Sequence, residues 1–81
     1  MFYIYTVTYS FDSDCFFRGP FDTEEGAWEA MLLDAKKELQ IDKEDGWNSV
    51  LQEDKEAGEI KVTTFFHDGD DVTKWKLFEK R

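Results

Sequence analysis

Residues 21–39 carry one apolar stripe at the helical period, and this stripe constrains the fold more than any other feature. Its members fall at positions i, i+3, i+4, i+7 and i+11: Trp28, Met31, Leu32, Ala35 and Leu39. Asp22 and Glu25 have the spacing of a capping box, so we expect an amphipathic helix over about residues 22–40. Because a helix with one apolar stripe must bury that stripe, the rest of the chain has to supply a partner surface.

The remaining segments are typical of β-strands. Residues 2–10 alternate, with Phe2, Ile4, Thr6 and Thr8 on one face and Tyr3, Tyr5, Val7 and Tyr9 on the other. Residues 15–18 return as a second strand that we expect to end at Gly19-Pro20. Residues 59–67 and 72–78 form a hairpin around the turn at residues 68–71, which contains an Asp-Gly pair.

Residues 47–52 fit either a short helix or a strand. We favour the strand, because the polar turn DKEAG connects this segment to the strong strand pattern of residues 59–67. The predicted order is then ββαβββ, an antiparallel β-sheet with one helix packed on one face. The chain belongs to the α+β class, and its 81 residues form a single domain.

The net charge limits the partners that the protein can bind. The chain has 19 acidic and 10 basic residues, for a formal charge of −9. Direct binding to nucleic acid or to an anionic membrane requires a positive patch, so we expect neither. The negative charge favours a basic protein partner. A simpler explanation is that the charge only keeps the protein soluble.

Several classes of site have no sequence signal. Cys15 is the one cysteine, so we expect no disulfide, no cysteine metal site and a cytoplasmic location. The first residues alternate like a strand and lack a basic segment, which argues against a signal peptide. No enzyme motif is present, and we expect no catalytic residue, metal or cofactor. A small hydrolase centred on His67, the one histidine, is the least favoured alternative.

Eight carboxylates fall in three segments that the predicted topology brings to one end of the sheet. These residues are Asp12, Asp14, Asp42, Glu44, Asp45, Asp68, Asp70 and Asp71. Turn chemistry alone favours Asp at such positions, which is one explanation of the pattern. The other is an electronegative surface that occupies a groove built to hold phosphates, and we take these eight residues as the candidate partner-binding set. The segment at 68–71 lacks the spacing of a calcium loop.

The aromatic residues exceed what one helix can cover. We expect a second surface on the uncovered face of the sheet, where Tyr and Trp are favoured contact residues. Its candidate members are Tyr3, Tyr5, Tyr9, Phe65 and Trp75. This face would support the alternative function, a homodimeric structural or adaptor domain; partial burial of the rings under loops is the third interpretation.

Two segments add a resemblance to these arguments: FDTEEGAW opens the helix, and DKEAGEIKV precedes the terminal hairpin. With the small size and strong acidity, they resemble small proteins carried by bacterial phages and mobile elements, including anti-CRISPR proteins. The resemblance covers the general character of the chain, so no site residue is carried over from it. It implies an inhibitor that mimics nucleic acid and occupies a basic groove of a host protein such as a CRISPR nuclease.

Overall fold

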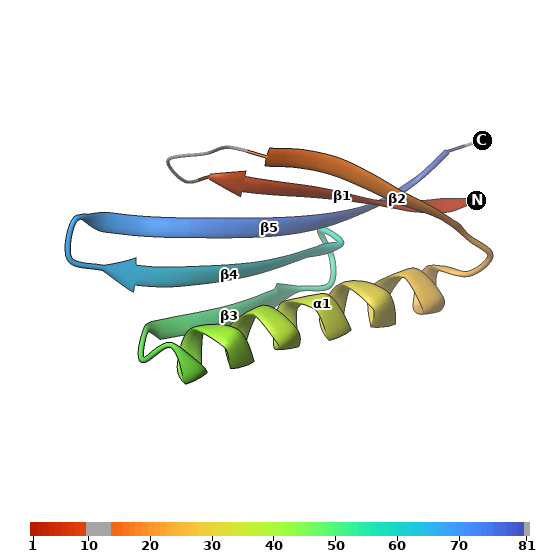
Figure 1. Ribbon diagram of the computed structural model, residues 1–81. Helices are drawn as coiled ribbons and strands as arrows, with labels where there is room; N and C mark the ends of the chain where they lie inside the picture. Colours follow the sequence, from red (N-terminus) through yellow and green to blue (C-terminus); the bar gives the residue numbers. More distant parts are fainter. Residues whose placement is uncertain (10–13, 81) are drawn as a thin grey trace.

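Five strands form one antiparallel sheet, and a helix lies across one of its faces (Figure 1). The structure is a computed structural model and describes residues 1–9 and 14–80. The elements in chain order are β1 (Phe2–Tyr9), β2 (Asp14–Phe21), α1 (Glu24–Glu44), β3 (Asn48–Asp54), β4 (Glu59–Phe66) and β5 (Gly69–Glu79). The predicted α+β class, the order ββαβββ and the strand at residues 47–52 are confirmed.

The last strand lies in the middle of the sheet. The strand order is β2-β1-β5-β4-β3, so β5 pairs with both β1 and β4, and β2 and β3 form the two edges. Trp75 is aligned with Thr6 on one side and with Ile60 on the other. Because aligned residues of antiparallel strands share a face, this register fixes which side chains meet the helix.

The core lies between α1 and the face of the sheet that it covers. Its buried members are Ile4, Ala27, Trp28, Met31, Ala35, Ile60, Val62 and Trp75. The predicted helical stripe therefore packs as expected, with Leu32 and Leu39 partly buried beside it. Trp75 is 4% exposed, so the prediction that it belongs to the aromatic contact face is wrong. Its neighbours Lys74 and Lys76 take the other face, which turns the indole towards the helix.

The helix begins and ends later than predicted. Thr23, in extended conformation, is the N-cap, and its side-chain oxygen accepts a hydrogen bond of 3.0 Å from the Gly26 N–H, so the cap is not Asp22. At the other end Gly46 has φ of +82°, and the Trp47 N–H donates to the Asp42 carbonyl at 2.8 Å. This is a Schellman motif, so the helix continues four residues beyond residue 40.

Strand β2 continues through Gly19-Pro20 to Phe21, contrary to the prediction that it ends at Gly19. Pro20 is tolerated because β2 is an edge strand and needs no hydrogen bond on its outer side. The register with β1 shifts between Phe2 and Ile4, at the position where Gly19 approaches Tyr3. Within the described residues, no helix is both long enough and apolar enough to cross a bilayer.

Candidate functional site

Two connections rich in acidic residues lie at one end of the sheet, away from the chain termini (Figure 1). One is the end of α1 with its link to β3, and the other is the turn between β4 and β5. Asp14 begins β2 opposite Thr8 of β1, and Asp12 lies outside the described residues. We define the acidic end by four exposed carboxylates, namely Glu44, Asp45, Asp68 and Asp70.

Most of the charge at the acidic end is uncompensated. Within residues 1–9 and 14–80, none of the four carboxylates forms an ion pair with a basic side chain. Glu44 accepts a hydrogen bond of 3.3 Å from the amide of Gln40, which carries no charge. Strands stand about 4.8 Å apart, so the two connections are separated by roughly 10 Å across the sheet. This separation is close to the Debye length of about 10 Å at 0.1 M salt, so screening between the two connections is only partial at that salt concentration.

Asp42 is part of the helix and not of the predicted connector. It is 8% exposed, and its carboxylate accepts a hydrogen bond of 2.6 Å from the buried Thr64 hydroxyl on β4. Asp71, predicted in the turn, belongs to β5, is aligned with Thr64 and is half-buried on the helix side. Asp42 is therefore a structural residue, because its carboxylate faces the sheet and cannot contact a partner.

Glu38 is a perturbed carboxyl group that sequence patterns did not single out. Burial raises the pKa of its side chain above the ordinary value, and the nearby Asp42 charge raises it further. Glu38 and Asp42 stand four residues apart on α1, so the two carboxylates share one side of the helix. The sequence predicts a helix that ends near residue 40 and so places Asp42 outside it, which is why sequence patterns do not pair these two carboxylates.

The predicted aromatic residues other than Trp75 lie on the uncovered face of the sheet. Tyr3 and Tyr5 are half-buried, and Tyr9 and Phe65 are exposed. Two further rings, which the sequence did not identify, join them: the Tyr3 and Phe78 centroids are 5.7 Å apart, and those of Tyr5 and Phe17 are 5.1 Å apart. Phe17 and Phe78 are themselves 6.1 Å apart, so four rings from three strands form one cluster.

Lysines and a glutamate lie beside these rings. The Glu59 carboxylate is 3.0 Å from Lys74 Nζ and 3.1 Å from Lys76 Nζ. The hydrogen bonds from these two ammonium groups hold the pKa of Glu59 below its ordinary value. On the neighbouring strand, a hydrogen bond with the Cys15 side chain, followed by burial, raises the pKa of the Tyr5 hydroxyl.

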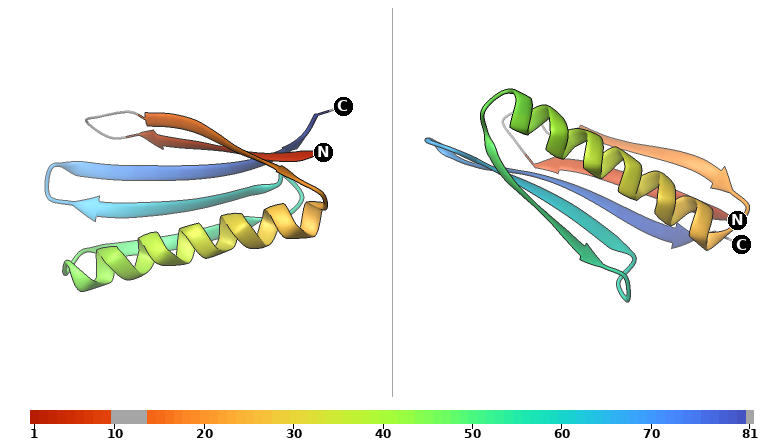
Figure 2. Two further views of the ribbon diagram at one scale, coloured as in Figure 1. Left: turned by 45° about the vertical axis from the view of Figure 1, so that its right-hand side comes forward. Right: turned by 90° about the horizontal axis from the view of Figure 1, so that it is seen from below.

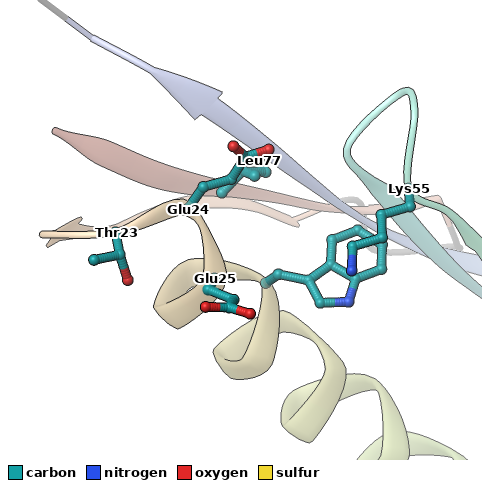
Figure 3. A pocket seen from close by; sticks show the side chains of 6 residues that line it. Thr23, Glu24, Glu25, Lys55 and Leu77 are labelled. Carbon is teal, nitrogen blue, oxygen red and sulfur yellow. The ribbon is translucent and has the colours of Figure 1, made fainter.

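A cavity of about 420 Å³ opens beside the first turn of α1 (Figure 3). Thr23, Glu24, Glu25, Trp28, Lys55 and Leu77 line it. The Lys55 ammonium lies 5.8 Å from the centre of the Trp28 ring, a cation–π contact. Of the polar side chains in the lining, Thr23 caps the helix and accepts the hydrogen bond from the Gly26 N–H.

In the part of the chain that the structure describes, no group of three or more His, Cys, Asp or Glu side chains is placed to hold a metal ion. His67 is exposed in the turn between β4 and β5, and Cys15 is exposed on β2. No protein-family profile matches the sequence, and comparisons with curated proteins and with solved structures give no match.

Proposed function

We propose that the protein is a non-enzymatic interaction protein whose acidic end occupies a basic groove of a nucleic-acid-binding protein. The observation that carries the proposal is the group of exposed carboxylates at one end of the sheet, without basic partners in the described residues. A groove that binds phosphates presents Lys and Arg side chains, and clustered carboxylates can pair with them. The resemblance to small acidic proteins of phages and mobile elements supports a host nuclease, such as a CRISPR nuclease, and a cytoplasmic location.

The charge of the whole molecule adds a kinetic advantage. At −9 the protein is attracted over long range to a basic surface, which raises the association rate at low salt. The same charge repels nucleic acid, so protein and nucleic acid compete for the groove without binding one another. Asp42 takes no part in the contact, and Asp71 contributes less than the exposed residues because it is half-buried.

The test is a pull-down with the tagged protein from a bacterial lysate, followed by affinity measurements on the purified proteins that it captures. One variant reverses three charges of the acidic end that lie outside the sheet faces: Glu44→Lys, Asp45→Lys and Asp68→Lys. The control reverses three exposed acids elsewhere and changes the net charge equally: Glu29→Lys, Glu53→Lys and Glu56→Lys.

We expect the captured partner to be a nucleic-acid-binding protein that DNA or about 1 M salt displaces, because the Debye length is then about 3 Å. The acidic-end variant should lose affinity by about tenfold or more, and the control should lose clearly less. Equal losses in the two variants would show that net charge alone governs binding. Unchanged affinity in the acidic-end variant would refute the proposal outright.

A further inference from the structure

The sheet has one face that α1 does not cover, and we call it the open face. Figure 2 shows the helix crossing the sheet on one side. The strand register assigns apolar side chains from all five strands to the other side, with polar ones among them: Tyr3, Tyr5, Val7, Tyr9, Phe17, Val50, Phe65, Val72 and Phe78. Phe17 is 64% exposed and Phe65 is 44% exposed, and they lie on β2 and β4, on opposite sides of the central strand. The apolar surface therefore extends across the sheet.

The molecule exposes more surface than a monomer of its mass normally does. Its accessible surface is 5821 Å² for 9.6 kDa. The surface of a typical folded monomer of this mass is about 5,100 Å², so the excess is roughly 700 Å². The radius of gyration is 13.0 Å, against about 12 Å for a compact chain of this length. The molecule is elongated, with extents of 43 × 20 × 19 Å, and this shape together with the uncovered sheet face accounts for both differences.

The open face has the area that a stable dimer requires. Five strands spaced by about 4.8 Å, with about eight residues each at about 3.3 Å, cover roughly 600 Å². Two such faces packed together bury about 1,200 Å², the lower bound of a standard specific interface. The area of one open face, roughly 600 Å², is close to the excess surface of roughly 700 Å² calculated for the isolated chain.

The charges of the open face are balanced, unlike those of the rest of the molecule. Three lysines point to this side, and three acids point to it as well: Lys61, Lys74, Lys76, Asp54, Glu59 and Asp70. The described side chains of the open face therefore sum to zero in a chain of net charge −9. An isologous interface must be complementary to itself, which a face with equal numbers of both signs can be and a purely acidic surface cannot.

We propose that a second copy of this chain covers the open face, so that two sheets pack face to face in a symmetric dimer. The ring cluster around Phe17 would supply the apolar centre, and the lysines of one copy would meet the acids of the other. Nucleic acid is a poorer occupant, because the net charge of −9 repels phosphates. The acidic end lies at one end of the sheet and shares one residue, Asp70, with the open face.

Salt separates this proposal from the proposed function. Two copies of charge −9 repel one another over long range, and salt screens that repulsion while apolar contacts persist. Dimerisation should therefore strengthen as salt rises from about 0.1 M to about 1 M, the range over which the Debye length falls from about 10 Å to about 3 Å. Binding of a basic partner by the acidic end should weaken over the same range.

The experiment is sedimentation of the purified protein from low concentration up to about 1 mM, at both salt concentrations. Two variants place a charge on the open face, Phe17→Lys and Phe65→Lys, and circular dichroism checks that each is folded. Leu33→Lys is the matched control, because Leu33 is 56% exposed on α1.

We expect a monomer–dimer equilibrium that tightens with salt. Each open-face variant should raise the dissociation constant by about tenfold or more, and Leu33→Lys should leave it within about threefold. A protein of 9.6 kDa that stays monomeric at every concentration and salt would overturn the proposal. So would a dimer that survives both open-face substitutions, as a dimer formed by edge-to-edge pairing of strands would.

Discussion

The hydrogen bond between Asp42 and Thr64 can be tested by removing its donor. Thr64→Val keeps the shape of a side chain that is buried on β4, but it removes the hydroxyl that donates to the Asp42 carboxylate at 2.6 Å. The Asp42 carboxylate, which faces the sheet, would then lack its hydrogen-bond donor. A hydrogen bond to a charged group contributes about 1.5–3 kcal/mol, and an unsatisfied buried group costs a similar amount.

We expect Thr64→Val to lower the free energy of unfolding by about 2 kcal/mol. This value lies towards the lower end of the range of about 1.5–3 kcal/mol, because Asp42 keeps a small contact with solvent. For a domain of this size, that loss lowers the melting temperature by roughly 8–16 °C. Asp42→Asn retains an oxygen that accepts from Thr64, and it removes a negative charge from the C-terminal end of a helix. We therefore expect the free energy of unfolding of Asp42→Asn to lie within about 1 kcal/mol of the wild-type value.

Urea and thermal unfolding, followed by circular dichroism at neutral pH, measure both effects. Thr63→Val is the matched control, because Thr63 is the next residue on β4 and faces the other side of the sheet. In the Asp42→Asn background, Thr64→Val should cost about 1 kcal/mol less than in the wild type, since the acceptor is then neutral. If Thr64→Val and Thr63→Val agree within about 0.5 kcal/mol, Asp42 is hydrated and the structural role assigned to it is wrong.

Two further substitutions test the helix and the β2 edge. Glu38→Gln should raise the free energy of unfolding at neutral pH, because the pKa of Glu38 is raised above 4.5 in the folded state and the ionised side chain therefore destabilises the fold. The gain in urea midpoint should fade as the pH falls through that raised pKa, and it should vanish below pH 4.5, where Glu38 is protonated in both states. Gly19→Ala should destabilise by more than about 1 kcal/mol, because φ is +144° and the new Cβ would stand 2.7 Å from a Tyr3 ring carbon. Gly69→Ala, with φ of +145° and no atom within 4 Å of the new Cβ, should lose less in the same thermal-unfolding assay, and equal losses would contradict the steric argument.

Local sequence patterns predicted the elements well but could not show which strand face the helix covers. The alternation of residues 72–78 separates Trp75 and Leu77 from Val72, Lys74, Lys76 and Phe78. The two lysines already indicated that Trp75 points to the opposite, buried side. Phe78 stacks on Tyr3 because the last strand pairs with the first. Local sequence patterns do not predict such a pairing between segments at opposite ends of the chain.

Asp42 illustrates a different limit of sequence reasoning. It stands seven residues after Ala35, which stands seven after Trp28, so it continues the buried stripe of the helix. The polar residues that follow Leu39 predict a connector, so the sequence alone places the end of the helix near residue 40. The tertiary structure explains how a carboxylate is tolerated at this buried position, because the Thr64 hydroxyl on β4 donates the hydrogen bond that a buried charge requires. The acidic residues of one segment therefore differ in role according to the partner that tertiary structure provides.

The segregation of charge links the two proposed surfaces. Since the described charges of the open face sum to zero, the net charge of −9 resides on the rest of the molecule, which includes Glu44, Asp45 and Asp68 of the acidic end. If a basic partner binds at the acidic end, it neutralises part of that charge and so reduces the repulsion between two copies. By thermodynamic linkage, dimerisation must then favour partner binding by the same factor. The coupling requires no change of conformation, because the long-range field of the two copies is sufficient to carry it.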